Sequence, residues 1–456
     1  MIFEKRLIKL SALGMFVCCF IAITIATGFC ESQLVVAVKK AMDNDYAAEQ
    51  VLGNFNGIGY GVRDLGTDAT GSWSSHGFFN FAVDPDPNWS MSFTTLFNDA
   101  GGPTTLDSNY NGAFSMQPTG NMEMTTDLSS QLLLGQLSED RDYLLIQYDT
   151  DTRETDDNRL RLFVATREGM GPYDNSVLNG SYTLRMMMLS GFHNISKNAL
   201  ISWGTLTFDG QSAYQFEYSN LDNTGESDTG TLTGTYLVDS IGRVSLSDDQ
   251  GLSFLEGYLS SEGNVFILTN VEYTFEGNIN ILLFGMQGAD ENNPYTVESL
   301  TGDYSYAGLW VDQLTAESTA DQMGEYSYGT INFDGLGGFT AEDNVFTSGR
   351  DAQINTYEGT YTITAEGEIL LITTTMNSQA LQQYRYQTGH LSNDGQLLVF
   401  NSVTEDSLDG SNDETTDTAT DTNNDDGKRP HTGSESGNDD DDDDGNSGGC
   451  FINSLQ

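Results

Sequence analysis

The sequence predicts an all-β protein built from three tandem modules of about eight antiparallel strands each. Three observations lead to this prediction. Sequence motifs recur in the same order along the chain, and the segments between them alternate apolar and polar residues, as half-buried strands do. The third is the count of 49 glycines against 7 prolines, which indicates that glycine makes most of the tight turns.

The repeat is clearest in the second and third modules. "PYDNSVLNGSY" at residues 172–182 returns as "PYTVESLTGDY" at residues 294–304, an offset of 122 residues. The later motifs of the two copies follow in the same order: "GTLTFDG" and "GTINFDG" from Gly204 and Gly329, "GTYLV" and "GTYTI" from Gly234 and Gly359, "GYLSSEGNVFIL" and "GHLSNDGQLLVF" from Gly257 and Gly389. A motif order repeated at a fixed period indicates a duplicated structural unit.

A more diverged copy precedes these two. Its counterparts of the four motifs are "NFNGIGY" at 54–60, "HGFFNFAVD" at 76–84, "NGAFSM" at 111–116 and "GQLSEDRDYLLIQY" at 135–148. Within it Phe79, Phe81 and Val83 alternate with polar or small residues, which again predicts a strand. The sequence therefore predicts three modules.

An antiparallel meander of this size must bury one face and protect its edge strands, and closing into a barrel does both. We therefore expect up-and-down barrels, with a β-sandwich as the alternative. The predicted organisation is a signal peptide at 1–28, an N-terminal linker with a short helix at 29–52, β-modules at 53–171, 172–293 and 294–404, and an acidic tail at 405–456. The Ala-rich stretch 34–50 suggests the helix.

Two resemblances accompany these motifs. The Gly-x-Tyr start of each module resembles the Gly-x-Trp start of lipocalin-like barrels, which implies a similar barrel fold. The "FDG" and "GTY" strands resemble tandem modules of secreted or surface proteins from environmental bacteria, over most of residues 53–404. This second resemblance implies a location and an architecture, and no activity.

The N-terminus predicts export through the secretory pathway. Lys5, Arg6 and Lys9 precede an uncharged apolar run from Leu10 to Phe29, and the small residues Ala26 and Gly28 permit cleavage after Gly28. The run is also long enough to remain as a membrane anchor. A lipoprotein with Cys30 as its first residue is a further alternative, but the bulky Phe29 stands where a lipobox needs a small residue.

The formal net charge of −49 excludes a nucleic-acid partner, because so acidic a surface repels phosphate backbones. From Glu405 onward the chain has sixteen Asp and Glu against Lys428 and Arg429 and almost no apolar residue. Such a segment cannot bury enough surface to fold, and we expect a disordered tail. The carboxylates of 439–444 predict loose association with divalent cations, whereas 421–427 lacks the Gly and Glu of a calcium loop.

The tail ends in Gly448, Gly449 and Cys450, followed by Phe and Ile. This end resembles a short C-terminal box of exported bacterial proteins in which an acidic or Gly-rich linker precedes Gly-Gly-Cys-Phe-Ile. The resemblance implies processing or surface attachment at Cys450. The alternative is a free thiol on a flexible tail.

No motif indicates catalysis. Residues 31–449 contain no cysteine, so disulfides, thiolate zinc sites and thiol nucleophiles are not available there. The four histidines, His76, His193, His390 and His431, share no local motif, and the carboxylates are too numerous to single out a pair. We therefore predict no enzyme, no cofactor and no specific metal site.

The leading interpretation is an exported, non-enzymatic repeat protein that acts as a scaffold, adhesion or display module toward an unknown extracellular partner. Membrane contact is expected only through the signal or anchor segment or through Cys450. The alternative is a protein that binds a small hydrophobic or carbohydrate ligand inside its barrels. Four tryptophans are the candidates for stacking on such a ligand: Trp73, Trp89, Trp203 and Trp310.

Overall fold

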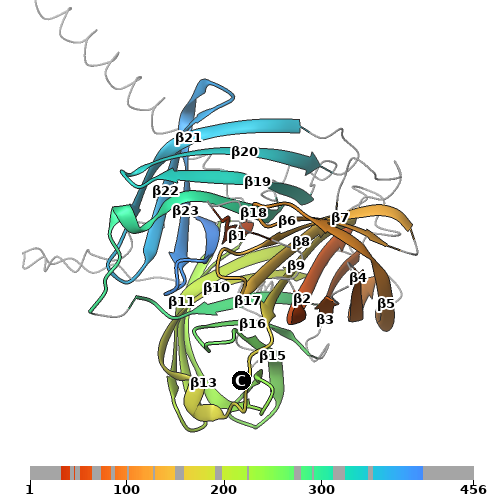
Figure 1. Ribbon diagram of the computed structural model, residues 1–456. Helices are drawn as coiled ribbons and strands as arrows, with labels where there is room; N and C mark the ends of the chain where they lie inside the picture. The colour runs from red at the N-terminus through yellow and green to blue at the C-terminus, as the bar shows by residue number, and fades with distance from the viewer. Residues whose placement is uncertain are drawn as a thin grey trace, which may run out of the picture. The chain divides into compact units, whose positions relative to one another are not determined.

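The computed structural model contains three closed eight-stranded antiparallel barrels (Figure 1). It describes residues 32–41, 46, 52–63, 73–83, 88–99, 102–126, 129–148, 159–190, 198–222, 225–271, 279–289, 292–311, 324–347 and 353–403. All-β architecture with three barrel modules is thus confirmed, and the sandwich alternative is wrong. The tail from residue 405 lies outside the described residues.

The first barrel consists of eight consecutive strands and closes by pairing of β2 with β9. Its strands are β2 (Gly53–Arg63), β3 (Trp73–Val83), β4 (Asn88–Asp99), β5 (Gly102–Met116), β6 (Asn121–Thr126), β7 (Ser129–Leu137), β8 (Tyr143–Tyr148) and β9 (Arg159–Arg167). Each strand pairs with the next one in sequence, so the barrel is a simple meander.

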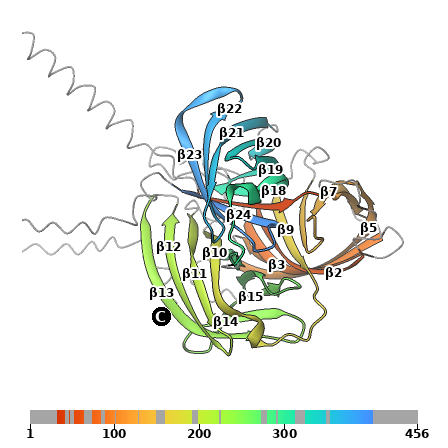
Figure 2. The same ribbon diagram turned by 60° about the vertical axis from the view of Figure 1, so that its left-hand side comes forward.

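The second barrel repeats this order and closes by pairing of β10 with β17 (Figure 2). Its strands are β10 (Asn179–Ser190), β11 (Asn198–Asp209), β12 (Ala213–Asp222), β13 (Ser227–Val238), β14 (Arg243–Ser247), β15 (Ser253–Leu259), β16 (Val265–Asn270) and β17 (Asn280–Met286). The 3-10 turn η2 (Asn175–Val177) precedes the first of them.

The third barrel draws one of its strands from the start of the chain. After the 3-10 turn η3 (Val297–Ser299) come β18 (Thr301–Val311), β19 (Gly324–Asp334), β20 (Gly338–Thr347), β21 (Gln353–Ile363), β22 (Glu368–Met376), β23 (Gln379–Leu391) and β24 (Leu397–Val403). The strand β1 (Ser32–Lys39) pairs with both β18 and β24 and closes the sheet, as the red strand beside β18 in Figure 1 shows.

The predicted linker and short helix at 29–52 is therefore wrong for residues 32–39. The segment "LVVAV" is rich in β-branched residues, and its alternate side chains enter two different cores. Leu34, Val36 and Val38 face one core, and Val35 and Ala37 face the interior of the third barrel. Two edge strands, β18 and β24, offer this segment two hydrogen-bonding ladders, and that tertiary context overrides the helix propensity of alanine.

The repeated motifs are explained by the tyrosines and turns that they contain. Tyr182 and Tyr304 are buried at equivalent places in β10 and β18, and their hydroxyls donate to the carbonyls of Gly263 and Gly395 at 3.0 and 2.9 Å. Both tyrosines therefore tie the first strand of the barrel to the same later hairpin.

The "GTY" tyrosines make the second equivalent pair of contacts. Tyr236 and Tyr361 donate to the carbonyls of Leu178 and Leu300, at 3.0 and 2.8 Å, just after η2 and η3. These hydrogen bonds hold the 3-10 turns against the barrel end. The contact recurs in the second and third barrels, whereas Phe114 of the first barrel, at the corresponding position, has no hydroxyl to make it.

The Phe-Asp-Gly ends of β11 and β19 are hairpin turns. Asp209 Oδ1 accepts hydrogen bonds from the backbone N–H groups of residues 211 to 213, and Asp334 Oδ1 accepts from Leu336 and Gly338. The glycines that follow, Gly210 and Gly335, have φ of 73° and 71°. Glycine adopts this left-handed conformation without steric cost.

Candidate functional site

The processing and attachment candidates lie outside the described residues. These are Ala26 and Gly28 at the predicted cleavage site, and Gly448, Gly449 and Cys450 at the C-terminal box. The acidic stretches of the tail, His193 and His431 also lie outside them. Within the described part of the chain, no group of three His, Cys, Asp or Glu side chains is placed to hold a metal ion, and no helix is long and apolar enough to span a membrane.

The tryptophans do not gather in one place. Trp89 is buried in the first barrel, stacked on Phe81 with ring centroids 5.7 Å apart, and its Nε1 donates to the carbonyl of Ala113 at 3.2 Å. Trp203 is half-buried on β11, and Trp310 is buried on β18. Trp73 is the first residue of β3. The three tryptophans whose side chains the structure describes, Trp89, Trp203 and Trp310, thus lie on three different barrels.

The interior of the first barrel is filled by aromatic rings. Phe79, Phe93 and Phe163 pack edge to face, with centroid distances of 5.5 to 6.4 Å. In the second barrel Phe208 packs edge to face against Tyr182 and Phe266, whose rings are tilted relative to each other, with centroids 5.3 to 5.8 Å apart. Edge-to-face packing at these distances is typical of a closed core.

A single apolar core connects all three barrels, and we call it the shared core. Its members are buried: Ile58, Tyr60, Tyr143, Leu145, Leu162 and Val164 of the first barrel, Met187, Leu189, Ala199, Val265, Ile267, Leu282, Phe284 and Met286 of the second, and Leu34, Val36, Val38, Ala307, Leu309, Tyr326, Phe346, Leu397 and Val399 of the third. The strands β1, β16 and β17 are accordingly buried on both faces.

Equivalent hairpins of the three barrels meet beside the shared core, and we call residues 138–142, 260–264 and 392–396 the hairpin junction. Each begins with a fully buried serine after a leucine: Ser138, Ser260 and Ser392. Each serine Oγ accepts the backbone N–H five residues later, at 2.9 to 3.1 Å. The serine of the repeated Leu-Ser pair thus stabilises its own hairpin turn through its side chain.

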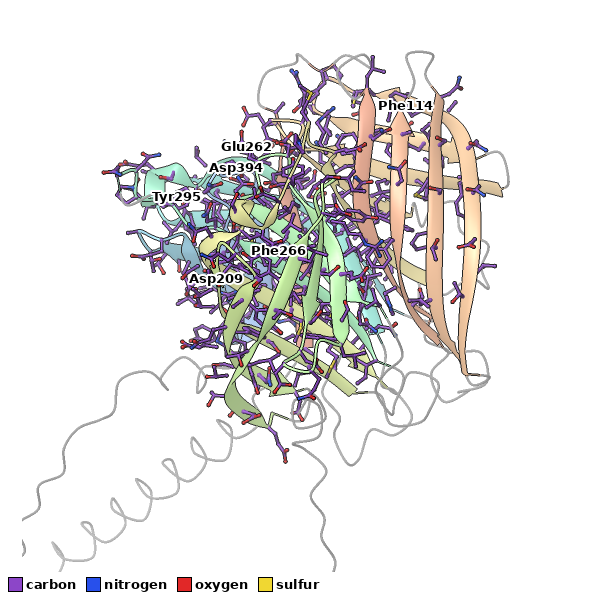
Figure 3. All side chains as sticks on the ribbon, turned by 90° about the horizontal axis from the view of Figure 1, so that it is seen from below. Phe114, Asp209, Glu262, Phe266, Tyr295 and Asp394 are labelled. Carbon is purple, nitrogen blue, oxygen red and sulfur yellow. The ribbon has the colours of Figure 1, made fainter. Side chains whose placement is uncertain are left out.

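Side chains cross between barrels at this junction. Asp394 Oδ2 accepts from Tyr143 OH at 2.7 Å and from Asn264 Nδ2 at 3.0 Å, so one carboxylate links all three barrels. Figure 3 labels Asp394 together with Glu262 of the second hairpin. Burial raises the pKa of Asp140, in the first hairpin, to about 6. We interpret the junction as a structural joint, because its polar groups are directed at one another.

Both described histidines are buried at contacts of the second barrel with its neighbours. His76 on β3 is hydrogen-bonded to Asn280 on β17, and burial lowers its pKa to about 4. His390 on β23 lies near Arg185 of β10, and burial and that guanidinium lower its pKa to about 3. Arg185 is itself buried and lies 3.7 Å from Glu368. These imidazoles are therefore neutral at neutral pH.

An open groove runs along the outer faces of the first and third barrels, and we call it the 1–3 groove. Its volume is about 320 Å³. Two interbarrel hydrogen bonds lie along it: Ser305 Oγ donates to Gln136 Oε1 at 3.0 Å, and Tyr326 OH donates to Gln147 Oε1 at 2.9 Å. The strands that line it are β6, β7 and β8 on one side and β18, β19 and β20 on the other.

The lining mixes polar and apolar side chains, with Lys40 and one exposed carboxylate on each wall. Glu123 comes from β6 and Glu342 from β20. Amide and hydroxyl groups dominate the rest, and the half-buried ring of Tyr328 stacks on Phe346 with centroids 5.6 Å apart. Amides beside an aromatic ring suit a ligand with many hydroxyl groups. The sequence did not reveal this groove, because its walls come from two modules.

No family model matches this sequence, and no curated protein does. Solved structures of transferrin binding protein B show a faint likeness: the isotype 1 protein from serogroup B Neisseria meningitidis has a TM-score of 0.18 and 10% identity over 81% of this chain and 77% of that one. Intact Ap-TbpB with its N and C lobes has a TM-score of 0.15 and 10% identity, over 77% and 76% of the two chains. At TM-scores this low, the likeness supports no inference about this protein.

Proposed function

We propose that this chain is an exported, non-enzymatic protein whose three-barrel body is a scaffold that presents its outer surfaces to an extracellular partner. The shared core is the observation that supports this most directly. Three barrels joined through one buried core and one polar junction present their outer faces in a fixed arrangement. The filled interiors of the first two barrels favour a structural role over ligand storage there.

Export is tested by fractionating cells that produce the full chain and by mass spectrometry of the mature ends. We expect the body in the extracellular or surface fraction, with residues 1–28 removed, and protease treatment of intact cells to release its peptides. A protein that stays inside the cell with residues 1–28 intact would refute the proposal. The same spectra report whether Cys450 is modified, cut off or a free thiol.

A second candidate function is binding of a saccharide in the 1–3 groove. The amide groups of the lining and the ring of Tyr328 favour it. The groove is also open to solvent and can admit a large ligand, whereas the interiors of the first two barrels are packed. A glycan array probed with the full chain tests it. We expect Tyr328→Ala to lose binding and Leu336→Ala, at a side chain 84% exposed on a distant turn, to retain it.

A further inference from the structure

The third barrel buries a carboxyl group inside. Asp343 on β20 is 1% exposed and lies in a row of residues paired across four strands: Tyr306 with Gly329, Gly329 with Asp343, and Asp343 with Asn355. Tyr306 OH donates to Asp343 Oδ2 at 3.0 Å, across the space left by Gly329. Burial raises the pKa of Asp343 to about 7. A buried carboxyl group costs stability unless something compensates its charge.

The other two barrels fill the same row without a charge. In each barrel the row contains the glycine that begins the "GTINFDG" motif or its counterpart: Gly329 in the third barrel, Gly204 in the second and Gly77 in the first. In the second barrel the pairs are Leu184 with Gly204, Gly204 with Tyr218 and Tyr218 with Gly230. In the first, Gly59 pairs with Gly77 and Gly77 with Thr95. The barrel therefore closes without a carboxylate in this row, and the fold does not require Asp343.

Four buried polar atoms of the third barrel have no hydrogen bond of regular geometry. They are Asp343 Oδ1, Ser327 Oγ, Tyr357 OH and Trp310 Nε1. The hydroxyls of Tyr357 and Ser327 lie within hydrogen-bonding reach of Asp343 and lower its pKa. Each of the four residues is at most 9% exposed. Buried polar groups with poor hydrogen bonds are rare in proteins, and a cluster of them beside a carboxyl group points to a ligand that completes their hydrogen bonding.

The indole of Trp310 belongs to the same cluster. A Cβ placed on Gly308 would lie 3.2 Å from Trp310 Nε1, so the indole nitrogen lies over Gly308. Gly308 is paired with Ser327 on the neighbouring strand. Ser327 therefore approaches Asp343 from β19 and Tyr357 from β21, and the indole nitrogen of Trp310 lies next to the Gly308–Ser327 pair.

The chemistry of these groups favours a singly charged organic cation. One carboxylate supplies one negative charge, and the rings of Tyr306, Tyr357 and Trp310 supply electron-rich faces, which attract ammonium groups when desolvated. Calcium and magnesium need several oxygen ligands of higher charge. The exposed guanidinium of Arg385 lowers the pKa of Asp343, but burial outweighs it and that pKa stays raised.

We propose that the third barrel binds a small organic cation, a protonated amine or a quaternary ammonium, with Asp343 as the counter-ion and Tyr306, Tyr357 and Trp310 as aromatic walls. The site is independent of the scaffold role, but it adjoins the 1–3 groove, because Tyr306 also lines that groove. To test this proposal, the full mature chain is titrated with methylammonium chloride and with tetramethylammonium chloride. Sodium chloride at equal ionic strength is the control. The readouts are melting temperature, tryptophan fluorescence and calorimetry at pH 8.

We expect saturable stabilisation by at least one of the two amines, and an affinity lowered at least about tenfold by Asp343→Asn, because the counter-charge is lost. Asp334→Asn, at an exposed turn, is the matched control and keeps the affinity. Tyr306→Phe keeps the ring and removes one hydroxyl, so it stays within a few fold of the parent protein. Binding weakens below a pH of about 7, where Asp343 is protonated.

Three results would overturn the proposal. The first is the absence of saturable binding by either amine. The second is equal affinity in Asp343→Asn, provided that this variant melts at least as high as the parent protein without ligand. The third is stabilisation by calcium, lost in Asp343→Asn, with none by the amines, which would make the cluster a metal site.

Discussion

Truncation of Val36 tests whether one core holds the three barrels together. Val36 lies in the middle of β1, is fully buried, and belongs to the shared core. The strand that carries it contacts β8 of the first barrel and β10 and β11 of the second, and Ser32 Oγ donates to the carbonyl of Ala199. A side chain at this position therefore supports all three barrels.

The expected cost of Val36→Ala follows from its burial. The change removes two methyl groups, each contributing about 0.8 kcal/mol in transfer free energy, and leaves a cavity that fixed neighbours fill only in part. We expect the free energy of unfolding to fall by about 2–3 kcal/mol. Ile354→Ala is the control, because Ile354 is 66% exposed, and its effect should stay within about 0.5 kcal/mol.

Urea denaturation measures the total loss, and hydrogen exchange with mass spectrometry locates it. If the shared core couples the barrels, amide exchange accelerates in β8, β10 and β16 as well as in β18 and β24, the direct partners of β1. Faster exchange confined to the third barrel, or a loss no larger than that of Ile354→Ala, would refute the coupling and leave three independent modules.

Three further predictions follow from the interbarrel contacts and the ends of the chain. The pKa values of His76 and His390 are about 4 and about 3 in the folded protein, below the usual 6.5. As the pH falls below 6.5, these histidines therefore stay neutral in the folded protein but become protonated in the unfolded chain. The contribution of these two histidines to stability should therefore fall as the pH drops from about 6.5 to 4, by up to about 3 kcal/mol per histidine. Asp140 and Asp343, whose pKa values are raised by burial, contribute in the opposite direction over the same range. The test therefore compares melting curves of the parent protein with those of His390→Leu, which should lose less stability as the pH falls, and an identical pH dependence of the two proteins would contradict the assignment. Asp394→Ala should lower the free energy of unfolding by about 1–3 kcal/mol, since it removes the closer acceptor of Tyr143 OH and one of the two acceptors of Asn264 Nδ2, whereas Asp249→Ala at an exposed turn should not. Limited proteolysis should remove the acidic tail from residue 405 and leave a body that reducing agents do not unfold, and unfolding by a reductant would contradict this.

Much of each barrel follows from local sequence. The alternation of "GTLTFDG", the Asp-Gly turns and the tyrosines of the "GTY" motif each act within one module, and all are found where the pattern predicts them. The candidate sites were harder to predict from local sequence. Asp343 stands in an apolar-facing position of "GFTAEDNVF", after Phe339 and Ala341, and that break in the alternation was the available sequence signal for it.

The contacts between modules had weaker signals. The uninterrupted apolar runs "LVVAV", "VFIL" and "ILLF" indicate strands buried on both faces, yet a run of that length does not distinguish a strand from a buried helix. The hairpin junction is built from the Leu-Ser turn that occurs in each module. Because this turn already stabilises its own hairpin, the motif does not indicate that the hairpins also contact one another.

The sequence by itself determined the strand period and the turns, because each depends on residues only a few positions apart, and it determined the number of modules, because the motifs recur in the same order. Tertiary structure alone decided that β1 closes the last barrel, that the 1–3 groove exists, and that one carboxylate at residue 394 joins three hairpins. These features depend on which faces remain uncovered once each sheet has closed. Burial of those faces against one another is a property of the assembled chain, and no local pattern encodes the partner.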